Sequence, residues 1–190
     1  VAQHPKPNRL RQVLGLEAKN PAIVFDDANI DQAVKECVNG ALSYNGQRCT
    51  ALKLIFVHKS VSAEFRSKFT KAVDALVLDH PATDSTLTPL PERNKVEHME
   101  AYVEDAVSKG ARVINKNAGR VSDTAFFPAV LYPVTDEMDI FHEEQFGPVV
   151  PNRVKAFLAS SVKKFWWLHT SWADAFFVQH ASRFFNSKEL

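Results

Sequence analysis

Glycine is scarce in this chain, and its few glycines never form a phosphate-binding pattern. The 190 residues contain six glycines, and none falls in the G-x-G-x-x-G spacing that opens a dinucleotide-binding helix. If the protein uses a nucleotide, we therefore expect the usual phosphate loop to lie outside these residues.

Cysteine is scarcer still, with Cys37 and Cys49 as the two examples. Two cysteines make no disulfide framework, which favours a reducing compartment, and we expect the cytoplasm. No Cys/His cluster has the spacing of metal ligands, so no metal site is expected.

An excess of one charge and a long apolar run are also lacking. The net charge is +1, so nothing indicates nucleic acid or an anionic membrane as a partner. No apolar run approaches the ~20 residues of a membrane span. The chain begins Val-Ala-Gln-His-Pro, with neither a signal pattern nor an initiator Met, which is typical of an internal piece. The 45% hydrophobic content suffices for the core of one domain.

Alternating strand and helix patterns occupy the middle of the chain. Residues 1–9 are polar with two prolines and are expected to form a linker. Strands are expected at residues 10–16, 21–25, 52–57, 111–114 and 126–131, and helices after a start at 26–29, from 61 to 78 and from 92 to 108. The predicted fold class is therefore α/β, a mainly parallel twisted sheet flanked by helices.

Three residues refine the helix predictions. Asn29 precedes Gln32 by the three positions of a capping box. Cys37 falls on the apolar stripe of the first helix, which predicts a core residue. Gly110 lies just past the third helix, where a left-handed cap belongs.

A Gly46-Gln47-Arg48-Cys49 run places a thiol directly after a turn glycine and a fixed cation. The thiolate is the nucleophilic form of cysteine, and a neighbouring positive charge favours it. A single cysteine is also often a small buried hydrophobe. Local cysteine signatures do not transfer between families, so these four residues leave both interpretations open.

Four stretches, taken together and in order, resemble the aldehyde dehydrogenase superfamily. They are residues 19–25 followed by Asp27-Ala28, residues 46–49, residues 127–131 and residues 143–149. The sequence of residues 45–53 is most similar to that of the NADP-dependent, non-phosphorylating glyceraldehyde-3-phosphate dehydrogenases. The resemblance implies a partial, incomplete catalytic domain of that family over residues 10–151, with the cofactor domain outside this chain.

The resemblance also implies roles for particular residues. Cys49 would attack an aldehyde, such as glyceraldehyde 3-phosphate, and a thioester would form after hydride transfer to NADP or NAD. Glu144 would hold the nicotinamide-side ribose, and Phe146 would pack near it. Arg48 would pair with the substrate phosphate, which suits a guanidinium, although a surface salt bridge is the competing interpretation. The small-molecule aldehyde is the expected partner, and full-length relatives would be homo-oligomers.

One departure concerns the general base for thioester hydrolysis. The family usually reads Leu-Glu-Leu-Gly-Gly-Lys, whereas residues 14–19 read Leu-Gly-Leu-Glu-Ala-Lys. Gly15 therefore occupies the position of the family carboxylate, and Glu17 is the local alternative. Residues two apart in a strand share a face but stand roughly 6.5–7 Å apart, and a base needs hydrogen-bond reach. Glu17 is the candidate base, with acyl release by another group as the alternative.

The other departure is the aromatic-rich tail, residues 152–190, which holds all three tryptophans and neither glycine nor proline. Phe165, Leu168, Trp172 and Phe176 have partial helical spacing, which favours an amphipathic helix for a partner or membrane surface. Out-of-frame translation of a truncated reading frame is the interpretation we prefer. Two functional alternatives to the dehydrogenase follow: an inactive pseudoenzyme or interaction module, and a cofactor-free thiol esterase.

Overall fold

The computed structural model describes residues 17–155 and 176–177. The helices are α1 (Ile30–Leu42), α2 (Ser62–Asp74), α3 (Arg93–Ser108), the short α4 (Asp139–His142) and the 3-10 turn η2 (Ser43–Gly46). The strands are β1 (Pro21–Val24), β2 (Leu54–His58), β3 (Arg112–Val113), β4 (Gly119–Arg120), β5 (Phe126–Phe127), β6 (Ala129–Tyr132), β7 (Val149–Lys155) and β8 (Phe176–Phe177).

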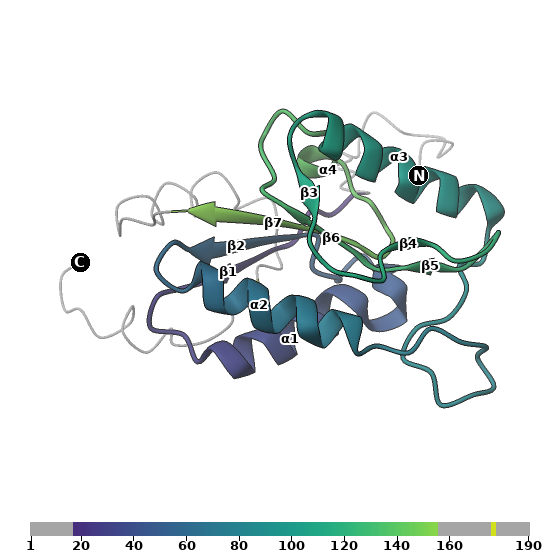
Figure 1. The fold of residues 1–190 in the computed structure, drawn as a ribbon, viewed down its shortest axis with the longest axis horizontal. Coiled ribbons are helices and arrows are strands. Elements are labelled where there is room, and N and C mark those ends of the chain that lie inside the picture. The colour runs from purple at the N-terminus through teal and green to yellow at the C-terminus, as the bar shows by residue number, and fades with distance from the viewer. Residues whose placement is uncertain (1–16, 156–175, 178–190) are drawn as a thin grey trace, which may run out of the picture.

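A six-stranded sheet in the order β3-β6-β7-β2-β1-β8 forms the centre of the molecule. Strands β6, β7, β2, β1 and β8 pair in parallel, and β3 pairs with β6 in the antiparallel direction. Helices α1 and α2 cover one face of the sheet, and α3 and α4 lie over the other (Figure 1). The predicted α/β class with a mainly parallel sheet is confirmed. A separate two-stranded sheet joins β4 to β5.

The first helix begins where the capping signal predicted. The side chain of Asn29 accepts a hydrogen bond from the backbone N–H of Gln32 at 3.0 Å, which satisfies one free donor of the first turn. The capping box is only half formed, because the amide of Gln32 donates to Glu36 instead. Cys37 is fully buried on the inner face of α1, so its assignment to the core is confirmed.

The second helix is shorter than predicted, and the third matches its prediction closely. Helix α2 ends at Asp74 rather than residue 78, because Val77 already accepts backbone hydrogen bonds from Thr86 and Leu87. Tertiary pairing has replaced the next helical turn. After α3, Gly110 has φ of +98° and donates to the carbonyl of Val107. The left-handed cap is therefore confirmed.

A proline divides the strand predicted at residues 126–131. Pro128 separates β5, which pairs with β4, from β6, which pairs with β3 and β7. Proline has no N–H to donate to a ladder. The Pro128 carbonyl instead accepts from the side chain of Asn115, whose oxygen accepts from the N–H of Val130.

Strand β7 has seven residues, and the sequence patterns did not predict it. It carries Pro151 in register with Leu131 of β6, and a proline within a central strand argues against a strand when read from sequence. The boundary predicted after residue 151 falls inside β7. Residues 1–16, with the expected linker and first strand, lie outside the described residues. In the tail, the described pair Phe176–Phe177 forms β8 beside β1, whereas the spacing favoured a helix for Phe176.

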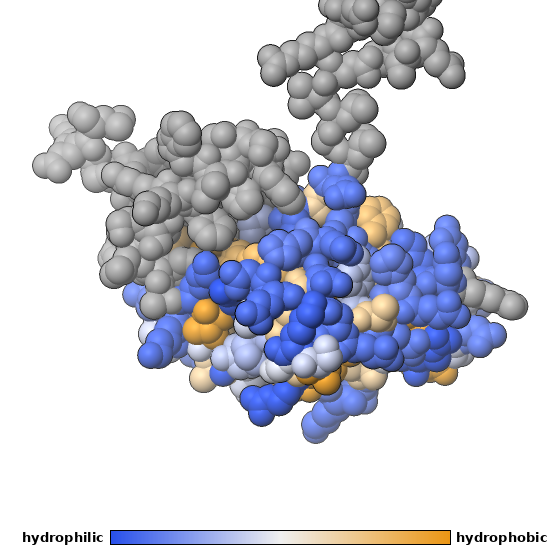
Figure 2. Space-filling view, turned by 90° about the horizontal axis from the view of Figure 1, so that it is seen from above, coloured by the Kyte–Doolittle hydropathy of each residue, from blue (hydrophilic) through white to orange (hydrophobic). Residues whose placement is uncertain are grey.

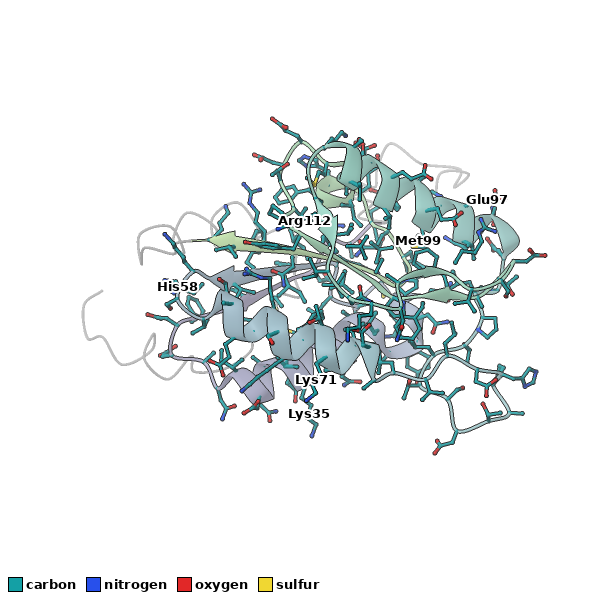
Figure 3. All side chains as sticks on the ribbon, viewed as in Figure 1. Lys35, His58, Lys71, Glu97, Met99 and Arg112 are labelled. Atoms are coloured by element: carbon teal, nitrogen blue, oxygen red, sulfur yellow. The ribbon has the colours of Figure 1, made fainter. Side chains whose placement is uncertain are left out.

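Two apolar layers hold the helices to the sheet. The layer beneath α1 and α2 includes Phe65 and Phe69, whose rings stack with centroids 5.4 Å apart. The layer beneath α3 includes Met99, fully buried, which points from α3 toward the sheet (Figure 3). The outer face above α3 is mostly hydrophilic (Figure 2). Among the described residues, no helix combines the length and the apolar character needed to cross a bilayer.

Asn152 in the central strand β7 is a defect in this core. Its side chain is fully buried, and neither its oxygen nor its nitrogen has a hydrogen-bond partner among the described residues. An unpaired buried polar group costs about 1–3 kcal/mol. Leucine has nearly the same shape as asparagine, so we expect Asn152→Leu to raise the free energy of unfolding by about 1–2 kcal/mol. For a chain of this size, each kcal/mol corresponds to a rise in Tm of roughly 2–4 °C.

Asn115 is the matched control for this prediction, measured by the same thermal and urea unfolding. It is also buried, but both of its side-chain atoms are hydrogen-bonded, at 2.8 Å to Pro128 and 2.9 Å to Val130. Asn115→Leu should therefore destabilise the chain. A loss of stability in both variants would show that Asn152 is not a defect.

Candidate active site

Three segments distant in sequence meet at one edge of the sheet. Residues 17–20 lead into β1, residues 49–53 into β2, and residues 143–147 toward β7. Because these three strands are neighbours and parallel, their amino ends lie together. Hydrogen bonds join the segments: Lys53 N–H donates to the Asn20 carbonyl at 2.8 Å, and the Gln145 amide donates to the Lys53 carbonyl at 3.0 Å.

The turn before Cys49 has an uncommon backbone. Tyr44, Asn45 and Gly46 all have positive φ, at 53°, 56° and 70°, a region that non-glycine residues seldom adopt. The side chain of Asn45 anchors the turn by donating to the Thr88 carbonyl at 2.7 Å. A Cβ on Gly46 would stand 2.7 Å from the carbonyl oxygen of Gly147. Only glycine therefore fits where this turn approaches the 143–147 segment.

Cys49 and Cys37 have opposite environments. Cys49 is exposed. The side-chain amide of Asn20 donates a hydrogen bond of 2.6 Å to the backbone carbonyl of Cys49. Cys37 is buried, and burial raises the pKa of its thiol to about 12. Cys49 is therefore the thiol that a reagent or substrate can reach.

Arg48 lies against its own turn. Its guanidinium donates to the Ser43 hydroxyl and stands 5.4 Å from the centre of the Tyr44 ring. Its Nε is buried and has no hydrogen-bond partner. No ion pair of Arg48 occurs within the described residues, so the salt bridge considered as its competing role is not formed there.

The two carboxylate oxygens of Glu144 differ in their hydrogen bonding within the described residues. Oε2 accepts from the backbone N–H of Ala18 at 3.0 Å. Oε1 is buried without a hydrogen bond and lies 3.6 Å from Lys53 Nζ. Phe146 follows with φ of +40°, and its ring centre is 4.8 Å from the same ammonium. A carboxylate oxygen that accepts no hydrogen bond within the described residues and lies beside a ring matches the chemistry of a sugar hydroxyl, so these residues are compatible with the ribose of a nicotinamide cofactor.

Two lysines are buried beside Glu144. Lys53 is 1% exposed, and burial lowers its pKa while the charges of Glu144 and Cys49 act in the opposite direction. Lys19 is also buried and donates to the Glu143 carbonyl at 2.6 Å and to Gln145 Oε1 at 2.7 Å. Burial and the nearby Lys53 lower the pKa of Lys19 to about 7.

The lowered pKa of Lys19 predicts a stability that rises with pH. Below pH 7 this lysine is charged in both states. Between about 7 and its ordinary pKa of 10.5, the folded chain releases the proton while the unfolded chain keeps it. The unfolded state then binds more protons, so the free energy of unfolding rises with pH by up to about 1.4 kcal/mol per unit. A neutral amine still has two hydrogens for its two acceptors.

Urea unfolding at pH 6, 7, 8 and 9 measures this slope. Lys19→Met should reduce the rise between pH 7 and pH 9, because the titrating group is gone, while the contribution of Lys53 remains. Lys35→Met is the control, since Lys35 is exposed on α1 and points away from the sheet (Figure 3). An unchanged slope in Lys19→Met would contradict the assignment.

Glu17 lies at the side of the site that faces α3. It is exposed, and its charge contributes to the raised pKa of Tyr102, which burial and the hydrogen bond to Glu143 mainly cause. Tyr102 donates a hydrogen bond to Glu143 Oε2 at 3.0 Å. Within residues 17–155, no hydrogen bond or ion pair connects Glu17 to Cys49.

Sequence reasoning missed the residues that hold the site together. They are Lys19, Asn20, Lys53, Tyr102 and Gln145. One signal was available, because Lys53 interrupts the apolar run of residues 52–57, and a lysine inside a buried strand pattern requires a partner. The other bonds depend on which strand edges meet, which a single sequence does not reveal.

A cavity of about 310 Å³ lies elsewhere, between α3 and the β4–β5 hairpin. Its floor is apolar, with Val103 and Phe126, and its rim carries the paired charges of Glu100 and Arg120. None of its lining residues belongs to the Cys49 site.

Comparison with known proteins gives a consistent result. Residues 1–156 match the model of the aldehyde dehydrogenase family. NADP-dependent glyceraldehyde-3-phosphate dehydrogenase of Streptococcus equinus is 36% identical over 141 residues, which are 73% of this chain and 29% of that protein. Salicylaldehyde dehydrogenase of Pseudomonas putida is 34% identical over 152 residues, 78% of this chain and 31% of that one.

Solved structures agree with the sequence comparison. The NADP complex of NADP-dependent glyceraldehyde-3-phosphate dehydrogenase from Bacillus halodurans has a TM-score of 0.73 at 32% identity, covering 78% of this chain and 31% of that one. An aldehyde dehydrogenase from Brucella melitensis has a TM-score of 0.76 at 27% identity, covering 89% and 35%. The chain thus spans about a third of the length of the proteins it matches.

Proposed function

The chain belongs to the aldehyde dehydrogenase family, and from that premise we propose that it forms part of the catalytic domain of an enzyme that oxidises an aldehyde to an acid. One observation carries the proposal. An exposed thiol, Cys49, and a carboxylate, Glu144, one oxygen of which accepts no hydrogen bond within the described residues, occur in segments that meet at the same edge of the sheet.

The proposed substrate is glyceraldehyde 3-phosphate and the proposed cofactor is NADP. Two curated relatives carry both in their names, and this family uses NAD or NADP. Other relatives are named for salicylaldehyde and succinate semialdehyde. Arg48 supports a phosphorylated substrate, because it directly precedes the exposed Cys49 and a guanidinium can bind phosphate through two parallel hydrogen bonds.

Each residue of this chain has a distinct task in the proposed reaction. The Cys49 thiol adds to the aldehyde: its sulfur bonds to the carbonyl carbon, the C=O double bond becomes single, and the thiol proton passes to the oxygen. When the hydride leaves that carbon, the oxygen gives up this proton and the thioester forms. A bound nicotinamide supplies the acceptor for the hydride. Glu144 holds the ribose through Oε1, and Phe146 packs beside it. Glu17 is the proposed base that removes a proton from the water that releases the acid from the Cys49 thioester.

We propose that the partial catalytic domain begins near residue 10, after a linker of residues 1–9. The sequence alone predicts the boundary between this domain and the tail of residues 152–190 after residue 151. The extent of β7 to Lys155 and of the family match to residue 156 support a boundary a few residues later.

Two absorbance assays on the purified chain test the proposed function. Formation of NADPH at 340 nm with glyceraldehyde 3-phosphate supports the dehydrogenase. Hydrolysis of 4-nitrophenyl acetate without NADP or NADPH formation supports the thiol esterase, which the exposure of Cys49 permits. A chain that circular dichroism shows to be folded, and that also fails to hydrolyse the ester in the assay that needs no cofactor domain, supports the non-enzymatic alternative.

A further inference from the structure

We propose that Lys53 is a positioning residue that orients the Glu144 carboxylate for the cofactor ribose and couples it to the Cys49 turn. The inference rests on the proposed function, because it assigns Glu144 the ribose-binding role given above. The family resemblance assigned a task to Glu144 and none to Lys53.

The ammonium of Lys53 lies between the two halves of the site. It donates to the Gly46 carbonyl at 2.9 Å, which belongs to the turn three residues before Cys49. It stands 3.6 Å from Glu144 Oε1 and 4.8 Å from the centre of the Phe146 ring. One buried cation therefore contacts the turn that carries the thiol and both proposed cofactor residues.

The position of the carboxylate depends on two contacts from different segments. The Ala18 N–H holds Oε2 at 3.0 Å, and the Lys53 charge lies on the side of Oε1. At 3.6 Å the ammonium attracts Oε1 electrostatically without taking a short hydrogen bond. The buried Oε1 therefore keeps an acceptor position that no hydrogen bond within the described residues uses, while the carboxylate stays fixed and electrically compensated.

A merely structural ion pair would have a different signature. Buried ion pairs often add little net stability, because desolvation offsets their attraction. If Lys53 served only the fold, its loss would weaken cofactor binding independently of Glu144. If Lys53 acts through Glu144, its loss should have no further effect once Glu144 has lost its charge.

The test uses reduced nicotinamide mononucleotide, which carries the nicotinamide ribose and lacks the adenosine half. Its fluorescence is titrated against the purified chain, Lys53→Gln, Glu144→Gln and the double variant. Glutamine at position 53 keeps a donor for the Gly46 carbonyl and removes the charge. We expect each single variant to weaken binding about 10-fold, and the double variant to bind no more weakly than Glu144→Gln, as for two residues that act as one unit.

Two further variants separate charge from folding. Lys53→Arg keeps the charge and should recover part of the affinity if it folds. Lys95→Met removes a second ammonium near the Phe146 ring, at 5.8 Å, and should bind like the parent chain. Circular dichroism and the rate of Cys49 alkylation confirm that each variant retains the fold and the turn.

The outcomes distinguish this inference from the proposed function. If Glu144→Gln weakens binding and Lys53→Gln does not, or if their effects multiply in the double variant, the role of Lys53 is overturned while the proposed function stands. If the parent chain does not bind the mononucleotide, or Glu144→Gln binds it equally well, the ribose role of Glu144 falls and this inference falls with it.

Discussion

Cys49→Ala is expected to lower aldehyde-dependent formation of NADPH by at least about 1,000-fold, because loss of a covalent nucleophile removes the reaction path rather than one contact. Alanine cannot form the bond to the aldehyde carbon, and no other described cysteine can reach it, since Cys37 is buried. The measurement is the initial rate at 340 nm at saturating NADP. The same substitution should remove hydrolysis of 4-nitrophenyl acetate.

Cys37→Ala is the matched control for the loss of a thiol. Cys37 lies in the core under α1, so its replacement should lower stability by about 1 kcal/mol and leave the rate unchanged. Iodoacetamide should label Cys49 in the folded chain and both cysteines only after unfolding, because burial raises the pKa of the Cys37 thiol to about 12. A Cys49→Ala chain with the parent rate would remove Cys49 from the mechanism.

The fold was predictable where the pattern depends on neighbouring residues. The start of α1 at its Asn29 cap and the end of α3 before Gly110 follow from local hydrogen bonding and backbone freedom. Two features depended on distant partners instead. Helix α2 stops early because Val77 pairs with Thr86 and Leu87, and β7 forms a central strand through its pairing with β2 and β6 although it contains Pro151.

The residues of the candidate site likewise include some that the sequence predicts and some that it does not. Cys49 and Glu144 could be proposed from motifs, because both candidate residues occur in distinctive local sequence. Their supports could not, because Lys19 and Lys53 reach across strands to segments more than 90 residues away or to a turn of unusual backbone. The order of the parallel strands in the sheet brings these segments together, and no single segment of the sequence predicts that order.

Glu17→Gln should stop the reaction after one turnover, with about one NADPH formed per Cys49 and a steady-state rate lowered by roughly 100-fold or more. Glutamine cannot take a proton from water, so the Cys49 thioester would accumulate while the first hydride transfer proceeds. Rapid mixing at 340 nm measures the burst, and mass spectrometry of the quenched chain detects the acyl group on Cys49. Glu36→Gln, an exposed carboxylate on α1, should leave both phases unchanged.

Gly15→Glu gives this experiment its sharpest contrast, because it returns a carboxylate to the position that the family motif uses. Within the described residues, Glu17 makes no hydrogen bond to the Cys49 segment and lies toward Tyr102, so its carboxylate must turn away from α3 to meet the water. If Glu17 is the base, Gly15→Glu should add little to the parent rate and should rescue Glu17→Gln. If Glu17→Gln keeps the parent rate while Gly15→Glu accelerates acyl release several-fold, this chain hydrolyses its thioester without a dedicated carboxylate, and the loss of the family residue at position 15 is what limits turnover.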